Sequence, residues 1–219
     1  MEDCSEDKDS YDSSNNDKIV AQSRINKLYC TKETERCLYN RTDKNKVSPK
    51  CCHDHLKEML FTFDKLAKQF NVKYFLDFGT LLGCVRDNKI IPYDTDIDIS
   101  MFFDDHDKLE QMRPFFKTHG YVLKKERDSG VFYRIFYSDI NLLHIDIHLR
   151  KIDENGIVYS HYSIKNWGIN KKDLLPMYYM MFEGQLMPIP RQFRKYLEHG
   201  YGIGCIETPK RKNEYKQKF

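Results

Sequence analysis

The sequence of 219 residues has no long apolar run and no strong net charge. No stretch approaches the roughly 20 consecutive apolar residues that a membrane-spanning helix needs. The net charge of +3 is small, which excludes the large positive field typical of a nucleic-acid-binding protein. We therefore expect no membrane span and no nucleic-acid partner, and the sequence leaves the oligomeric state open.

The first residues also lack the features of a signal peptide. Residues 1–16 are acidic and rich in serine and asparagine, whereas a signal peptide has a basic start and an apolar core. As written, the chain is expected to be cytoplasmic. A location in the lumen of the Golgi or the endoplasmic reticulum would require an anchor that has been removed.

The chain is long enough for one hydrophobic core with a small appendage. Few apolar side chains occur before residue 25, which is typical of a disordered segment. Composition divides the chain into four predicted parts: a disordered tail (1–24), a cysteine-rich loop (25–52), a core domain (53–205) and a basic tail (206–219).

Helical and strand patterns alternate through the middle of the chain. Apolar residues recur at helical spacing from His53 to Phe70, which predicts a helix with one face on the core. Further patterns predict a helix at 104–118, a last helix after Pro190, and strands at 73–78, 97–103, 121–125, 131–137 and 143–149. The proline-containing run 187–190 cannot be a central strand, because proline lacks the N–H donor.

The most informative stretch lies between residues 73 and 99. An apolar strand is followed by a glycine-threonine turn, a short helix and a second strand that carries Asp94, Asp96 and Asp98. Residues two apart in a strand share a face, so Asp96 and Asp98 project together. Two close carboxylates repel each other unless a cation lies between them. Oxygen ligands favour Mg²⁺ or Mn²⁺, which usually hold substrate phosphates. This spacing therefore indicates phosphoryl-type chemistry.

The turn before this strand is suited to bind a phosphate group. Gly79 allows close approach of the backbone, and the Thr80 hydroxyl with the N–H groups at Leu81 can bind phosphate oxygens. An ordinary helix cap at Thr80 is the alternative. Arg86 is a candidate clamp for the same phosphates, with a salt bridge to a nearby aspartate as the alternative. Asp94 is a candidate for contact with the substrate or with a metal-bound water; a hydrogen bond to the turn after Arg86 is the alternative.

These residues resemble the core of the LicD/fukutin family, within the nucleotidyltransferase superfamily. The resemblance is carried by FGTLLG at 78–83, Arg86 and IPYDTDID at 91–98, and it extends from about residue 30 to about residue 202. It implies an α+β fold, with a nucleotidyltransferase-like mixed β-sheet flanked by helices and a small N-terminal zinc-binding loop.

The resemblance also implies a third carboxylate on a neighbouring strand, and Asp146 matches it. Ile145 and Ile147 bracket Asp146, so its side chain points away from the packed face. Asp146 would complete the metal site or accept a proton from an attacking hydroxyl; a solvent-exposed aspartate is the alternative. His144 and His148 share its face and can orient it, contact phosphate or serve as ordinary surface histidines.

Four cysteines precede or open the first long helix: Cys30, Cys37, Cys51 and Cys52. Such a set forms either two disulfides or a tetrahedral zinc site, and the lack of a secretory signal favours reduced thiols. The spacing is similar to that of a zinc-binding loop of the family, although the gap between Cys37 and Cys51 is shorter here. We therefore expect structural Zn²⁺, with His53 or His55 able to replace one sulfur.

The resemblance implies a metal-dependent transferase. It would move a phospho-alcohol group, such as phosphocholine or ribitol phosphate, from a CDP-linked donor to a glycan hydroxyl. Asp96, Asp98 and Asp146 would bind Mg²⁺ or Mn²⁺ and carry the catalysis. Two alternatives stay open: a nucleotidyltransferase that moves the nucleotide of an NTP, and a non-catalytic binding module. The sequence identifies neither the donor head group nor the acceptor glycan.

Overall fold

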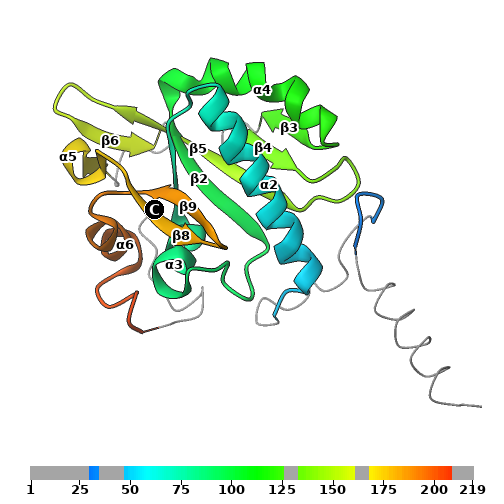
Figure 1. Cartoon of the computed structure of the whole chain (residues 1–219). Helices are drawn as coiled ribbons and strands as arrows, with labels where there is room; N and C mark the ends of the chain where they lie inside the picture. The colour runs from blue at the N-terminus through cyan, green and yellow to red at the C-terminus, as the bar shows by residue number, and fades with distance from the viewer. Residues whose placement is uncertain (1–29, 35–46, 126–132, 161–167, 209–219) are drawn as a thin grey trace, which may run out of the picture.

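The computed structural model of the chain describes residues 30–34, 47–125, 133–160 and 168–208. The predicted tail at 1–24, Cys37 and most of the predicted basic tail lie outside these residues. The helices are α2 (Lys50–Gln69), α3 (Phe78–Asp87), the short η1 (Phe103–Asp105), α4 (His106–Thr118), α5 (Lys171–Leu174) and α6 (Phe193–Tyr201) (Figure 1). The strands are β1 (Tyr74–Leu76), β2 (Asp96–Phe102), β3 (Val122–Lys125), β4 (Tyr133–Phe136), β5 (His144–Ile152), β6 (Ile157–Ser160), β7 (Gly168–Asn170), β8 (Tyr178–Phe182) and β9 (Gln185–Ile189).

The larger sheet is mixed. Its strands follow the order β1-β2-β5-β4-β3, and β6 and β7 continue from β5. Strands β2 and β5 are parallel neighbours, whereas the other neighbouring pairs are antiparallel. Strands β8 and β9 form a separate two-stranded sheet. This arrangement confirms the predicted α+β fold with a mixed sheet flanked by helices.

The two central strands have one apolar face and one polar face. The isoleucines at 97, 99, 145 and 147 are fully buried. Helix α2 packs against β2 and β5 and crosses the sheet in Figure 1. Its buried side chains follow the predicted helical spacing, among them Leu56, Leu60 and Phe63. The opposite face of the sheet carries the polar residues of both strands, including the predicted aspartates.

Helix α2 begins earlier than the sequence predicts. It starts at Lys50 instead of His53, so Cys51 and Cys52 lie in its first turn and not in the preceding loop. Helix α4 and strands β2 to β5 lie within a few residues of their predicted positions.

The start of helix α3 corrects two expectations. The helix begins at Phe78 instead of Leu81, because the Asp77 side chain accepts a hydrogen bond from the Phe78 N–H at 2.7 Å and caps the helix. Thr80 is therefore not the cap, and it lies with Gly79 inside the first turn of the helix. Asp94 precedes β2 and is not part of that strand.

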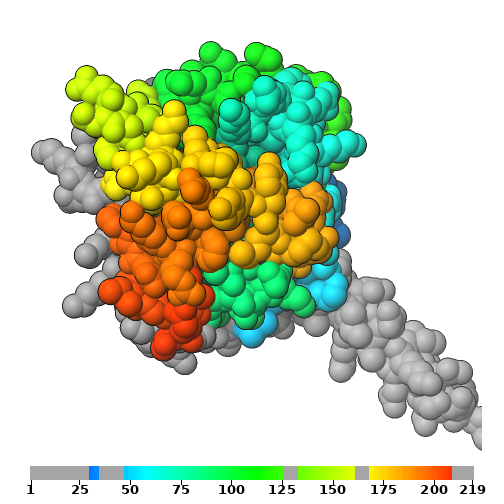
Figure 2. All heavy atoms as spheres, turned by 60° about the vertical axis from the view of Figure 1, so that its left-hand side comes forward, coloured from blue at the N-terminus to red at the C-terminus, as the bar shows by residue number. Residues whose placement is uncertain are grey.

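The last third of the chain packs against β1 and α3. Pro188 lies in β9, which pairs only with β8 among the described strands, as expected for a proline-containing run. Figure 2 shows this segment, in orange, as a continuous surface that borders helix α3. In the described part of the chain, every helix is too short or too polar to cross a membrane.

Candidate functional site

A cleft with a volume of about 210 Å³ opens where α3 and β2 begin. Its lining includes five of the residues that the sequence predicts for the site: Gly79, Asp94, Asp96, Asp98 and Asp146. Phe78, His148 and Tyr201 also line it. Thr80 and Arg86 are not part of the lining. The structure therefore brings most of the predicted site together on the polar face of the sheet.

Strand register determines which of these side chains meet. The parallel pairing of β2 with β5 places Asp98 opposite Asp146 and Asp96 opposite His144. The potential ligand atoms of Asp96, His144 and Asp146 all lie within 4.8 Å of one another. Asp98 lines the same cleft but does not belong to this group, and its Oδ1 lies 3.2 Å from Nε2 of His148. A shared metal ion for all three aspartates stays a prediction.

The cleft concentrates negative charge in a partly buried place. Burial raises the pKa of Asp98 to about 6, and the charges of Asp96 and Asp146 act in the same direction. The hydrogen bond and charge of His148 oppose this increase. Carboxylates that resist ionisation in this way favour the binding of a cation among them.

Arg134 is a member of the site that sequence reasoning missed. It lies on β4 directly opposite Asp146. Its Nε donates to Oδ1 of Asp146 at 2.5 Å, and its Nη2 donates to Oδ2 at 3.0 Å. Asp146 is 7% exposed, so this bidentate pair fixes the carboxylate plane. Asp146 points away from the apolar face as predicted, but it lies on a central strand and not at a solvent-exposed edge.

A buried hydrogen-bond network holds the start of α3, which borders the cleft. The Asp77 carboxylate, which is fully buried, accepts hydrogen bonds from Ser100 at 2.5 Å, Arg150 at 2.6 Å and Tyr196 at 2.9 Å. These partners come from β2, β5 and α6, so the network joins three elements to the start of α3. Phe78, which follows Asp77, has a positive φ of 44° and places its ring against the cleft.

Thr80 and Gly79 join helix α3 to its neighbours. The Thr80 hydroxyl accepts a hydrogen bond from the N–H of Asp98 at 2.8 Å and is 3% exposed. Its place is therefore between α3 and β2 and not on the open cleft. A Cβ atom on Gly79 would lie only 2.9 Å from Oδ2 of Asp94, so glycine allows the Asp94 carboxylate to lie against the helix.

Arg86 lies near the end of α3, and the structure does not place it at the cleft. Its Nη1 atom is buried and has no hydrogen-bond partner among the described residues. Within the described ranges it forms no ion pair with Asp94 or Asp98, which was the alternative to a phosphate clamp. The phosphate contact of Arg86 stays a prediction.

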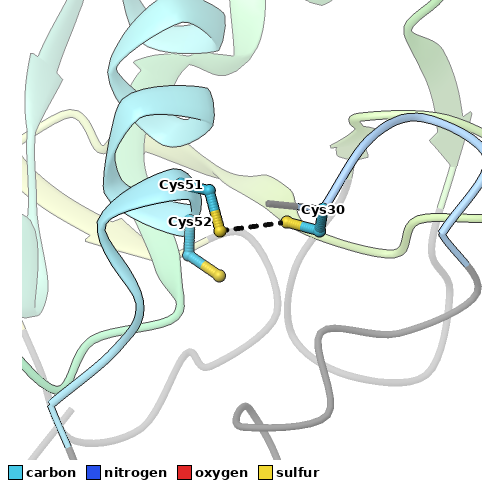
Figure 3. Close-up of side chains that lie close together, drawn as sticks. All are labelled: Cys30, Cys51 and Cys52. Carbon is cyan, nitrogen blue, oxygen red and sulfur yellow. Dashed lines mark hydrogen bonds between the residues drawn. The ribbon is translucent and has the colours of Figure 1, made fainter. Parts of the chain in front are cut away.

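Three of the four cysteines expected to bind zinc lie together. The sulfurs of Cys30, Cys51 and Cys52 are within 4.8 Å of one another, and all three residues are buried. Figure 3 shows the side chains of Cys51 and Cys30 pointing toward each other, with 3.5 Å between their Sγ atoms. His55 Nε2 lies 2.7 Å from the backbone carbonyl oxygen of Cys30, to which it donates. This bond involves only one ring nitrogen of His55, so it does not exclude His55 as a ligand. The fourth ligand predicted from the sequence, Cys37, lies outside the described residues.

Comparison with known proteins identifies related sequences. The family model described as LicD/FKTN/FKRP, nucleotidyltransferase domain, matches residues 71–192. Human ribitol 5-phosphate transferase FKRP is 29% identical over 209 residues, which cover 87% of this chain and 41% of that protein. The uncharacterized protein RP689 of Rickettsia prowazekii is 31% identical over 165 residues, covering 75% of this chain and 52% of that protein. The chain thus spans about two fifths of the length of the FKRP proteins that it matches.

Two solved structures show a more distant likeness. The lincosamide antibiotic adenylyltransferase LnuA has a TM-score of 0.45 at 18% identity, covering 61% of this chain and 79% of that one. The ANT(2")-Ia structure in complex with adenylyl-2"-tobramycin has a TM-score of 0.38 at 12% identity, covering 69% of this chain and 77% of that one.

Proposed function

Because this chain belongs to the LicD/FKTN/FKRP nucleotidyltransferase-domain family, we propose that it transfers a phospho-alcohol group from a CDP-linked donor to a glycan hydroxyl. The observation that carries this proposal is the cleft in which Asp96, Asp98 and Asp146 meet the first turn of helix α3. The human relative is a ribitol 5-phosphate transferase, so ribitol phosphate is our first choice of group. Phosphocholine is the second.

The residues of the cleft fit a divalent cation. Asp96 and Asp146 place carboxylate oxygens within 4.8 Å of each other, and oxygen ligands of this kind suit Mg²⁺ or Mn²⁺. When bound, the ion would neutralise the donor phosphates and the charge that develops on the leaving nucleotide. We assign its binding to Asp96 and Asp146, with Asp98 as the third negative charge facing the same space.

The protein groups have separate tasks in the proposed reaction. The donor diphosphate lies at the N-terminal end of α3, where the first N–H groups of a helix lack partners within the helix. Gly79 and Asp94 line this end of the cleft. The acceptor oxygen attacks the phosphorus that bears the alcohol, the bond from that phosphorus to the CMP oxygen breaks, and CMP leaves. The proton of the acceptor hydroxyl passes to a carboxylate of the cleft.

We assign the proton to Asp98. Its carboxylate lines the cleft and is not among the assigned ligands of the ion, and a general base must lie within reach of the proton that it accepts. Asp146 is less suited to this task, because Arg134 already donates to both of its oxygens. The sequence alone left the role of Asp146 open between base and metal ligand, and the Arg134 pair favours the ligand.

The cysteine cluster supports a structural zinc site in the same chain. Cys30, Cys51 and Cys52 present three sulfurs from two segments, and a tetrahedral zinc site needs four ligands. We propose Cys37 as the fourth. Because Cys30 precedes helix α2 and the other two lie in its first turn, the ion would fasten the N-terminal segment to the domain.

Product analysis tests the proposed reaction. The protein is incubated with Mg²⁺ or Mn²⁺, a panel of glycan acceptors and either CDP-ribitol, CDP-choline, CDP-glycerol or an NTP. Release of CMP that requires both a CDP-alcohol and an acceptor supports the proposal, with Asp96→Asn as the inactive control. Release of pyrophosphate from an NTP would instead identify a nucleotidyltransferase. Binding of donor without any product would identify a non-catalytic module.

A further inference from the structure

We propose that His144 is a direct ligand of the divalent cation in this cleft, together with Asp96 and Asp146, and that the site therefore prefers Mn²⁺ to Mg²⁺. This inference rests on the proposed function in one respect, because it concerns the same cation site. It adds a nitrogen ligand to a site for which the sequence predicted oxygen ligands alone.

Three side chains converge because of the strand register. His144 is the first residue of β5 and lies opposite Asp96, the first residue of its parallel neighbour β2. Asp146 is two residues further along β5, so it projects from the same face as His144. The potential ligand atoms of the three residues lie within 4.8 Å of one another. Side chains at the starts of the two adjacent strands can therefore bind one ion.

The histidine ring has the protonation pattern of a metal ligand. Its Nδ1 atom lies 2.7 Å from the backbone carbonyl oxygen of Leu142. A carbonyl oxygen can only accept a hydrogen bond, so Nδ1 must carry the proton. In the neutral ring this leaves a lone pair on Nε2. Metal-binding histidines characteristically donate their other ring N–H to a carbonyl or carboxylate in this way, which fixes both tautomer and orientation.

Nε2 of His144 faces a carboxylate oxygen. It lies 3.4 Å from Oδ1 of Asp146, so either a second ring proton or a metal cation between or beside the two atoms would satisfy both. Arg134 donates to both oxygens of Asp146, but each carboxylate oxygen has two lone pairs. Asp146 can therefore hold Arg134 on one side and an ion on the other.

The neighbouring histidine provides a matched comparison. His148 projects from the same face of β5, but its Nε2 lies 3.2 Å from Oδ1 of Asp98 and its ring contacts Phe78 with 4.5 Å between centroids. Among the described residues it does not belong to the group of converging ligand atoms. A substitution at His148 therefore disturbs the cleft without removing the proposed ligand.

A nitrogen ligand changes which metal the site prefers. Mg²⁺ takes oxygen ligands in near-ideal octahedral geometry and retains several waters, whereas imidazole suits transition metals. A site with two carboxylates and one imidazole should therefore bind Mn²⁺ more tightly than Mg²⁺. A site of three carboxylates would show much less preference.

Electron spin-echo spectroscopy of bound Mn²⁺ tests the ligand directly, because a coordinated imidazole nitrogen couples to the metal electrons. The full chain is compared with His144→Asn and His148→Asn, and Mn²⁺ and Mg²⁺ affinities are measured by calorimetry. We expect nitrogen coupling in the wild type and in His148→Asn, but not in His144→Asn. We also expect His144→Asn to weaken Mn²⁺ binding by about 10-fold or more, with a smaller change for Mg²⁺.

Several results would overturn the inference. These are Mn²⁺ bound without nitrogen coupling in the wild type, coupling that persists in His144→Asn, or an unchanged preference for Mn²⁺ in that variant. Mn²⁺ bound without nitrogen coupling would mean that Nε2 of His144 carries a second ring proton and does not bind the metal. Binding of CDP-alcohols is measured in parallel. Nitrogen coupling without donor binding would support His144 as a ligand and reject the proposed function. Donor binding without nitrogen coupling would support the proposed function and reject His144 as a ligand.

Discussion

Burial in the cleft changes the ionisation of Asp98. Thr80 accepts a hydrogen bond from its N–H, and burial raises the pKa of its carboxyl to about 6. Since an unfolded aspartate has a pKa of about 3.9, the folded protein binds this proton more tightly than the unfolded chain does. The stability that this residue contributes is therefore complete below about pH 4 and is lost as the pH rises through about 6.

Asp98→Asn should accordingly stabilise the protein in a pH-dependent way. In EDTA at about pH 7.5 we expect the variant to exceed the wild type in free energy of unfolding by about 1–3 kcal/mol, and at about pH 4 we expect little difference. Thermal unfolding followed by circular dichroism measures this. Asp139→Asn, at an exposed position, is the control. A difference that does not change with pH would contradict the assignment of Asp98.

Local periodicity predicted the orientation of the site residues but not their partners. Alternation along a strand suffices to place Asp96 and Asp98 on one face and Asp146 on the polar side of β5. The partner of Asp146 is Arg134, which lies 12 positions earlier in the chain. Identifying that pair requires the cross-strand register, which one sequence does not contain.

The start of helix α3 also depends on residues that are distant in the sequence. The sequence predicted the helix, but with a start three residues too late. Its start depends on Asp77, whose carboxylate is held by Ser100, Arg150 and Tyr196. Tyr196 lies 119 positions from Asp77. Nothing near Asp77 in the sequence indicates that this aspartate is buried and paired.

Two glycines of α3 should respond differently to substitution by alanine. A Cβ on Gly83 would lie 2.5 Å from the backbone oxygen of Lys89, whereas a Cβ on Gly79 would meet the end of the Asp94 side chain. The backbone at Lys89 cannot move away from a new methyl group as easily as the Asp94 side chain can. Gly83→Ala should therefore destabilise the protein by about 1–3 kcal/mol. Gly79→Ala should cost less stability but weaken donor binding. Urea unfolding and calorimetry distinguish the two, and equal losses of stability would contradict this account.

At the scale of the whole molecule, segments with a clear apolar period were predictable, and those of the less regular last third were not. The sheet of β2 to β5 and the helix that covers it follow from clear patterns of buried residues. Strands β6 to β9 were missed, because this part of the chain shows no clear apolar alternation and β9 contains Pro188. Such strands depend on their partners more than on their own sequence.

Zinc should fasten the N-terminal segment to the rest of the molecule. We expect about one Zn²⁺ per purified chain, lost in Cys51→Ser and retained in Cys205→Ser, as elemental analysis would show. Cys205 is a buried free thiol outside the cysteine cluster, which makes it the matched control. Removal of the ion with a strong chelator should lower the melting temperature of the wild type. A chain without zinc, or with two disulfides among these cysteines, would refute the site.

The most direct test of the central claim is calorimetric titration of the chain with CDP-ribitol, with Mn²⁺ and again with EDTA. The donor phosphates would face the charges of Asp96, Asp98 and Asp146 without a cation, so we predict binding with Mn²⁺ and none that is measurable in EDTA. We also predict none for Asp96→Asn with Mn²⁺. Equal binding in Mn²⁺ and EDTA, or unchanged binding by Asp96→Asn, would contradict the assignment of this cleft.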